Sequence, residues 1–404
     1  MRSLVASLDG IEQAKIALTD KQWTQEELAE QVEVDRQTVN KFFNQKAIDR
    51  KIFVEICHTL GLDWQEIAVA TTSKRQPTQS ALSGNTNPFP FGTSAPPDRF
   101  YGRRNVILEV KSRIGGISPQ CINIVGHRRV GKTSLLRYIR ERTIEFCPES
   151  QKPLIVSLDL QDNKFHTPEG ILEGLRRGIG KQTGTEPWQR QENDDGFAVE
   201  DGLQAIADDG YRAIVMLDEF EAIARRLAEF EDWGEDWRSK ASAGLVTMVI
   251  ASKRPLAKLY QTLHLTSPFD NIFSTTILGA LATEDWQHLV RDGLGGEVGT
   301  LELAWIDELA GGIPFYVQMA ASMLWQYGDL AKAEEEFVFQ SRSHFQKLWQ
   351  ELKEPEQIAI QKAIRGEAVE SKVMVNILQR YGILRNDGGL FSRTFTEFVR
   401  AEYR

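Results

Sequence analysis

The sequence predicts an α/β protein with a parallel sheet flanked by helices, a small all-helical unit before it and further helices after it. Three observations predict this. A glycine-rich segment, 126–133, lies between an apolar run of strand type and an amphipathic helix. Two further apolar runs, 213–217 and 245–251, have the composition of buried strands. Residues 71–98 hold five of the 14 prolines and separate the first 70 residues from the rest.

Composition and charge narrow the class of protein. The 404 residues are 41% apolar and 26% charged, as in an ordinary globular protein with two or three domains. No apolar run approaches the ~20 residues of a membrane span, and the N-terminus lacks a signal-peptide pattern, so we expect no membrane contact and a cytoplasmic location. The three cysteines favour reduced thiols. A net charge of −9 requires any nucleic-acid contact to come from a local patch.

The N-terminal unit, expected over 1–70, carries two short helices joined by a turn. Thr24 and Glu27 form a capping-box pattern at the start of the first helix, and the second starts at Arg36. The pattern over 11–69 resembles the helix-turn-helix of the lambda-repressor-like family, although Glu33 stands where that family usually has glycine. The resemblance implies contact with double-stranded DNA, through Arg36, Gln37, Thr38, Asn40 and Lys41 in the major groove and Lys46, Arg50 and Lys51 on phosphates.

Local charge agrees only in part with DNA binding. Residues 36–51 hold five basic side chains and one acidic side chain, whereas residues 1–75 hold ten basic and twelve acidic side chains. The basic patch is therefore one-sided, and a protein-docking module of the same shape is the alternative.

Residues 126–133 fill every fixed position of the phosphate-binding P-loop, in the order strand, loop, helix. Gly126 and Gly131 let backbone N–H groups approach phosphate oxygens, Lys132 supplies a charge for the β- and γ-phosphates, and Thr133 can bind Mg²⁺. The alternative is a glycine-rich turn with an incidental lysine. The expected residues that bind ATP or ADP are Gly126, His127, Arg128, Arg129, Val130, Gly131, Lys132, Thr133 and Ser134.

The apolar run 213–217 ends in Asp218 and Glu219, which has the form of a Walker B motif. Asp218 can hold Mg²⁺ through water, and Glu219 can orient or deprotonate the attacking water, so we expect slow ATP hydrolysis. A strand followed by an acidic surface turn is the alternative.

Three further motifs suggest the class of ATPase. Residues 99–104 resemble the F-x-G-R box of origin-recognition-like AAA+ proteins and STAND signalling ATPases, which implies that Tyr101 and Arg103 lie beside the nucleotide. Residues 248–254 resemble sensor 1, which implies that Arg254 or Lys253 reaches the terminal phosphate. We favour Arg254, because a planar guanidinium suits a phosphate.

Residues 309–315 resemble the G-x-P motif of the STAND lid, which implies that Pro314 abuts the nucleotide. A helix-ending glycine followed by a proline-started helix gives the same letters. Beyond the lid, a helix over 371–381 and a hairpin over 382–392 resemble a winged helix, which in STAND proteins closes over ADP; a second DNA contact is the competing interpretation.

The expected organisation is a helix-turn-helix unit (1–70), a flexible linker (71–98), a P-loop ATPase core (99–280), a helical lid (281–334) and a winged-helix domain (335–404). In this order the motifs resemble a STAND or archaeal-type AAA-like P-loop ATPase. This implies an ATP-dependent switch that couples nucleotide state to DNA binding or to nucleotide-dependent homo-oligomer assembly. The alternatives are a signalling or defence ATPase that recruits a protein partner, and a transposition- or replication-associated ATPase that assembles on DNA.

Overall fold

The structure, a computed structural model, describes residues 3–4, 6, 8–21, 23–32, 34–44, 46, 48–62, 64–67, 86–116, 118–147, 152–188, 196–227, 229–265, 268–296 and 298–403. The chain divides into two compact units, residues 1–81 and 82–404, and each is described by itself. Residues 71–85 of the expected linker lie outside the described part. No helix within the described ranges is long and apolar enough to cross a membrane.

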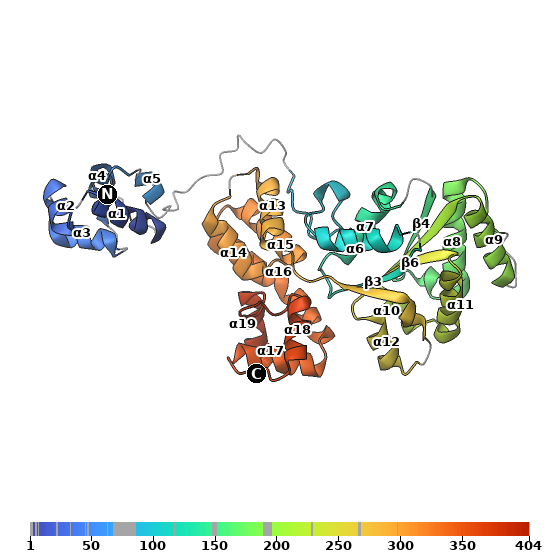
Figure 1. The fold of residues 1–404 in the computed structure, drawn as a ribbon. Helices are drawn as coiled ribbons and strands as arrows, with labels where there is room; N and C mark the ends of the chain where they lie inside the picture. Colours follow the sequence, from blue (N-terminus) through green and yellow to red (C-terminus); the bar gives the residue numbers. More distant parts are fainter. Residues whose placement is uncertain are drawn as a thin grey trace. The chain divides into compact units, whose positions relative to one another are not determined.

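The first unit is a bundle of short helices around a small apolar core (Figure 1). Leu28, Val39, Phe42 and Phe53 are fully buried in it. The capping box at Thr24 is present, as expected, and confirms where the first helix of the pair starts. The elements are β1 (Ser3–Leu4), α1 (Leu8–Asp20), α2 (Gln25–Gln31), α3 (Arg36–Phe43), β2 (Ile48–Asp49), α4 (Arg50–Leu60) and α5 (Trp64–Ile67).

The second unit is built on a five-stranded sheet in the order β4-β5-β6-β3-β7, and every pair of neighbours is parallel. The strands are β3 (Cys121–Val125), β4 (Lys152–Asp159), β5 (Tyr211–Asp218), β6 (Val246–Ser252) and β7 (Phe273–Ile277). Every residue of β3 and β6 is buried, as their mainly apolar sequences predict. The predicted parallel α/β core is confirmed.

Helices cover both faces of this sheet (Figure 1). Alternate residues of β5 belong to two different apolar clusters, one shared with α6 and α7 and the other with α8, α9 and α11. The helices of this layer are α6 (Arg104–Ile114), α7 (Lys132–Glu141), α8 (Pro168–Thr183), α9 (Gly196–Asp208), α10 (Glu221–Ala224), α11 (Phe230–Ser242) and α12 (Leu256–Leu263), with the 3-10 turns η1 (Pro97–Arg99), η2 (Thr143–Glu145), η3 (Asn163–Phe165) and η4 (Pro268–Ile272).

Seven helices follow the sheet: α13 (Thr283–Leu294), α14 (Thr300–Ala310), α15 (Pro314–Tyr327), α16 (Leu330–Glu351), α17 (Glu354–Ile364), α18 (Lys372–Arg380) and α19 (Arg393–Glu402). Helix α16 runs across the expected boundary between lid and winged helix at 334/335. Between α18 and α19 the chain makes a short hairpin, in which the Arg385 N–H donates to the Gly389 carbonyl at 2.8 Å. The assignment of this part to the winged-helix class stays a prediction.

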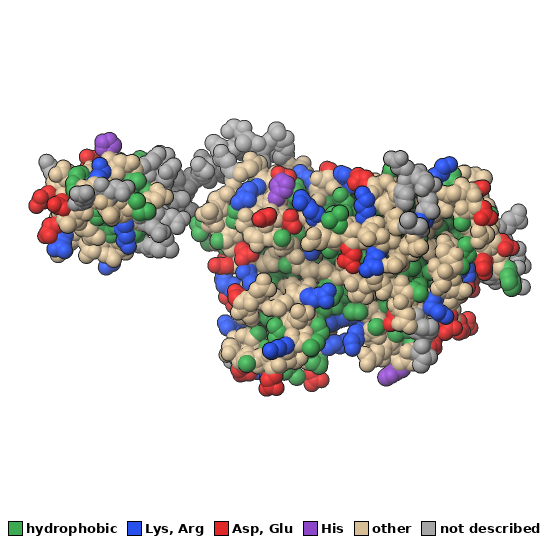
Figure 2. All heavy atoms as spheres, viewed as in Figure 1, with side chains coloured by type: hydrophobic (Ala, Val, Ile, Leu, Met, Phe, Trp, Pro, Cys, Tyr) green, Lys and Arg blue, Asp and Glu red, His purple; other side chains and the backbone are tan. Residues whose placement is uncertain are grey.

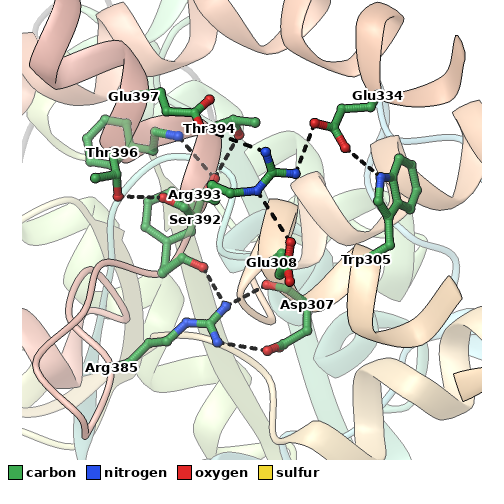
Figure 3. A network of polar contacts seen from close by, with 12 residues as sticks. Trp305, Asp307, Glu308, Glu334, Arg385, Ser392, Arg393, Thr394, Thr396 and Glu397 are labelled. Atoms are coloured by element: carbon green, nitrogen blue, oxygen red, sulfur yellow. Dashed lines mark hydrogen bonds and ion pairs between the residues drawn. The ribbon is translucent and has the colours of Figure 1, made fainter. Parts of the chain in front are cut away.

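A polar network joins the lid helices to the C-terminal helices (Figure 3). The Arg385 guanidinium donates to the Asp307 carboxylate at 2.7 Å and to the Phe391 carbonyl at 2.9 Å. Arg393 pairs with Glu334 of α16 at 2.9 Å and with Glu308 of α14 at 3.3 Å. The helices α14, α16 and α19 are therefore held together by charge as well as by apolar packing.

Residues 86–99, which we name the strap, are packed against the second unit. Phe89 is 3% exposed, and the Asn87 amide donates to the Ser322 hydroxyl at 2.7 Å. The Arg99 guanidinium donates to the Pro88 carbonyl at 2.6 Å. The expectation of a flexible linker is therefore wrong for residues 86–98. The expectation failed because a proline-rich composition does not show that the phenylalanines within it pack against another part of the fold.

Candidate functional site

The predicted phosphate-binding loop joins the end of β3 to the start of α7, at the edge where parallel strands end. Arg129 and Gly131 both have left-handed backbone conformations, with φ of 73° and 98°. A Cβ added to Gly126 would lie 2.7 Å from the Leu278 carbonyl oxygen. The loop is therefore tightly curled, with its backbone N–H groups on the inside. Position 126 needs glycine because the loop contacts the Leu278 backbone there.

Lys132 is held against this loop. Its side chain is 5% exposed, and Nζ donates to the carbonyls of Gly126 at 2.8 Å and His127 at 3.2 Å. Burial lowers the pKa of Lys132, and the nearby carboxylates of Glu219, Glu221 and Asp218 oppose that shift. The ammonium group is thus pre-positioned at the loop, where a phosphate would meet it.

Thr133 and Asp218 meet across the site. The Thr133 hydroxyl donates to the Asp218 carboxylate at 2.6 Å, and burial raises the pKa of Asp218. Both groups offer hard oxygen atoms of the kind that Mg²⁺ prefers, so the pair fits a magnesium ion. Glu219 follows directly in a left-handed conformation, with φ of 51°, and lines the pocket described next.

A pocket of about 400 Å³ opens beside the loop. The P-loop, the start of α15 and the strap supply most of its lining, and the ends of β4 and β5 supply one residue each. Arg129 holds its guanidinium 4.3 Å above the Phe315 ring, which joins the loop to α15. The lining residues are Phe91, Gly92, Thr93, Ser94, Arg128, Arg129, Gly131, Lys132, Thr133, Ser134, Gln161, Glu219, Pro314, Phe315 and Gln318.

Arg103 contacts the loop and Tyr101 contacts α13, and neither is among the described residues that line the pocket. The Arg103 guanidinium donates to the carbonyls of Val130 at 3.0 Å, Gly279 at 2.6 Å and Ala280 at 3.1 Å. The Tyr101 hydroxyl donates to Asp292 at 2.8 Å. Arg103 therefore braces the backbone of the loop, and both N–H groups of its Nη2 are used in doing so.

Lys253 and Arg254, the sensor-1 candidates, face the C-terminal helices. Both nitrogens of the Arg254 fork bind Glu356 of α17, one of them at 2.6 Å, and one also donates to the Glu351 carbonyl at 3.0 Å. Lys253 pairs with the Glu351 carboxylate at 3.0 Å. In this structure the Arg254 guanidinium is paired with a carboxylate 102 positions later, so its contact with a nucleotide stays a prediction.

Arg128 of the P-loop pairs with the same Glu351 carboxylate. Glu351 and Glu356 thus hold three cations at the end of the candidate nucleotide site: Arg128, Lys253 and Arg254. We name these five side chains the latch.

Glu221 is a half-buried carboxylate that sequence reasoning missed. Its Oε1 accepts the Lys253 backbone N–H, and its Oε2 has no partner in the described part of the chain. Burial raises its pKa. The only signal was its place in the first helical turn after Asp218, since Glu221 begins α10.

His127, expected to fill a variable position of the loop, is 2% exposed and packs 4.7 Å from the Tyr381 ring. Neither ring nitrogen has a partner among the described residues. Burial, together with the charges of Arg254, Lys132 and Lys253, lowers the pKa of His127 to about 3. The end of α18 therefore covers the P-loop with an aromatic contact.

The shifted pKa of His127 predicts acid sensitivity. The unfolded chain binds a proton near pH 6.5 and the folded protein does not until about pH 3, so stability is fully present above pH 6.5 and falls as the pH drops through this window. At pH 5 the loss is about 2 kcal/mol. Urea unfolding between pH 7.5 and 5 should give a shallower pH dependence for His127→Gln, and the wild-type dependence for the exposed control His288→Gln. Equal slopes in all three proteins would contradict this.

The predicted DNA-contacting residues lie mostly on one exposed surface of the first unit. Arg36, Gln37, Asn40 and Lys41 are exposed on α3, and Lys46, Arg50 and Lys51 are exposed beyond it. Thr38 is half-buried, and its hydroxyl donates to Asp35 at 3.0 Å. Arg36 pairs with Glu26 at 3.4 Å, and Arg50 lies over the Trp64 ring. Figure 2 shows acidic and basic side chains together on the visible face of this unit.

Comparisons with known proteins identify two segments of the chain. Residues 15–67 match the family model described as helix-turn-helix, and residues 189–369 match the model described as novel STAND NTPase 2. No curated protein matches.

Solved structures give the fold of the second unit. The Walker-type ATPase paby2304 of Pyrococcus abyssi is similar at 14% identity and a TM-score of 0.53, over 77% of this chain and 99% of that one. The Aeropyrum pernix ORC2 protein in its ADPNP–ADP complexes reaches 12% identity and 0.46, over 77% and 97%. The Aeropyrum pernix ORC1 protein in complex with DNA reaches 10% and 0.43, over 75% and 94%. The chain therefore has one segment that is similar to helix-turn-helix proteins and one that is similar to STAND NTPases, and its second unit shares the fold of the Walker-type ATPase.

Proposed function

We propose that the protein is an ATP-binding switch that hydrolyses ATP slowly and couples nucleotide state to DNA binding. The observation that carries this proposal is the latch, in which Glu351 and Glu356 neutralise Arg128, Lys253 and Arg254. One of these cations belongs to the P-loop, and the other two follow the end of β6, the neighbour of β3. The C-terminal helices thus use charges that a terminal phosphate would also attract.

A phosphate and a carboxylate compete for the same cations, because both present oxygen atoms in a geometry that suits an arginine fork. ATP carries a γ-phosphate that ADP lacks, so ATP would draw cations from Glu351 and Glu356 and loosen α16 and α17. ADP would leave the latch closed. The two nucleotides differ in their contacts with the two states, which is the requirement for a ligand-driven switch.

Hydrolysis follows from Glu219 in the same proposal. Its carboxylate lines the pocket beside Thr133, in position to orient a water molecule toward the terminal phosphate. Thr133 and Asp218 would hold Mg²⁺, which supplies neutralisation of phosphate charge. Turnover would then reset the latch to its ADP form. We propose a cytoplasmic location for this cycle.

DNA binding rests on the helix-turn-helix segment and on the exposed basic side chains of α3 and α4. A second candidate is a unit that recruits a protein partner. It is favoured by the pairing of Arg36 with Glu26, which reduces the charge available to DNA. Nucleotide-dependent association of several copies is compatible with either candidate.

The test measures binding of the full chain to duplex DNA by fluorescence anisotropy over a series of salt concentrations, with ADP or a non-hydrolysable ATP analogue. We expect tighter binding with the analogue. Glu351→Gln in ADP should bind like the wild type with the analogue, because the amide releases Lys253 and Arg128. Lys46→Ala with Lys51→Ala should lower the salt slope by about 2, as expected for two lost phosphate contacts.

Glu335→Gln on the exposed face of α16 is the matched control and should behave as wild type. Equal DNA affinity in both nucleotide states, with no effect of Glu351→Gln, would contradict the switch. An absence of salt-dependent DNA binding would favour the protein-recruiting unit. Equal competition by mixed-sequence DNA and a selected site would favour an ATPase that assembles on DNA without sequence preference.

A further inference from the structure

The strap is anchored at a site made for an aromatic ring. Phe89 packs against Gly293 of α13 so closely that a Cβ added to Gly293 would lie 2.3 Å from the Phe89 ring. Asn87 holds the strap to α15 and fixes its local conformation. Its side-chain amide donates to Ser322 of α15, and its side-chain carbonyl oxygen accepts the Phe89 N–H at 2.9 Å. The N-terminal end of the strap is thus bound to two helices of the lid.

The middle of the strap belongs to the nucleotide pocket. Phe91, Gly92, Thr93 and Ser94 line the pocket together with the P-loop. The Phe91 ring packs edge-on against Phe315 at 5.7 Å, and Phe315 in turn carries Arg129 of the P-loop. The pocket therefore has one wall that comes from the segment leading to the first unit.

The strap is also tied to the helix that begins in the P-loop. The Ala95 N–H donates to the Ser134 hydroxyl at 3.0 Å, and the Arg137 guanidinium donates to the Ser94 carbonyl at 3.3 Å. Ser134 directly follows the predicted Mg²⁺ ligand Thr133. Any ligand that rearranges the start of α7 acts on these two hydrogen bonds.

We propose that Phe91–Ser94 is a nucleotide-contacting wall, and that occupancy of the pocket by a nucleoside di- or triphosphate tightens the docking of the strap. The proposal rests on nucleotide binding at the P-loop, and it adds a second route from nucleotide to helix-turn-helix that does not pass through the latch. A ligand that contacts the docked strap stabilises the docked form by its contact energy. The strap directly follows the segment that connects to the first unit. Docking of the strap therefore fixes one end of that connecting segment on the second unit.

The test is hydrogen–deuterium exchange of the full chain with and without ADP. Three strap amides report docking, because Phe91, Thr93 and Ala95 donate to Phe89, Pro90 and Ser134 respectively. We expect their exchange to slow with ADP. Phe89→Ala should speed their exchange and weaken mant-ADP binding about tenfold if the docked fraction falls to about a tenth.

Gly293→Ala tests the same anchor from the opposite side, because its added methyl group displaces the Phe89 ring without touching the pocket. It should reproduce the effects of Phe89→Ala. Phe339→Ala is the control, since Phe339 is a 78% exposed phenylalanine of α16.

Three outcomes would overturn the proposal. If wild-type protein binds mant-ADP while strap exchange is unchanged, or if both anchor variants bind it as tightly as wild type, the strap is no part of the site although the nucleotide site stands. If wild-type protein does not bind mant-ADP, the proposed function itself fails, and the strap proposal fails with it.

Discussion

Replacing Lys132 by alanine is expected to weaken ATP binding by about 100-fold or more, equivalent to about 3 kcal/mol. The ammonium group is buried and directed by two loop carbonyls, so its loss removes a charge fixed directly at the loop. Isothermal titration with ATP and Mg²⁺ measures the effect. Lys258→Ala, which removes an exposed lysine of α12, is the matched control and should bind as wild type does.

Glu219→Gln separates binding from chemistry at the same site. It should keep ATP affinity close to wild type and reduce phosphate release, because the amide cannot accept a proton from water. Full turnover in Glu219→Gln would contradict the Walker B role. Undiminished binding by Lys132→Ala would contradict the assignment of the P-loop.

Glu356→Gln is expected to lower the free energy of unfolding of the second unit by about 3 kcal/mol. The side chain of Glu356 is 7% exposed and that of Arg254 is 18% exposed, so the change leaves a largely buried guanidinium without its counter-charge. The carboxylate also accepts the Lys353 N–H at 2.8 Å at the start of α17. Urea denaturation followed by circular dichroism measures the loss.

A second variant distinguishes the ion pair from general damage. Arg254→Met with Glu356→Met removes both charges, and it should recover most of the lost stability, because an apolar pair often replaces a buried ion pair without cost. Glu367→Gln breaks an exposed ion pair, in which the side chain of Arg365 is 53% exposed and that of Glu367 is 49% exposed, and it should cost far less stability than Glu356→Gln. Equal losses for the buried and exposed pairs would contradict the latch as a buried interaction.

The parts of the fold that the sequence predicted are those with short-range signals. The strands ending at Val125 and Asp218 are mainly apolar, and the capping box at Thr24 spans four residues. The P-loop was recognisable because its glycines, lysine and threonine lie within eight positions and depend on the local backbone alone.

The features that the sequence did not predict depend on contacts between residues that lie far apart in the chain. The partner of Arg254 lies about a hundred positions further on, and nothing in residues 248–254 distinguishes a guanidinium that binds phosphate from one that binds Glu356. Phe89 packs against a glycine in α13, Gly293. A glycine in a helix gives no sequence signal that a phenylalanine from a distant segment will pack on it. Burial of Glu221 likewise arises only when α10 and the end of β6 meet.

The brace made by Arg103 has a mechanical consequence. It binds the P-loop at Val130 and the connection after β7 at Gly279 and Ala280, and a Cβ added to Gly279 would lie 2.3 Å from the Arg380 carbonyl oxygen of α18. The two backbones meet at Gly279 with no side chain between them to absorb a displacement. A shift of the P-loop by a fraction of an ångström would therefore also displace the end of α18, because the segment after β7 is bound to the loop and in direct contact with α18.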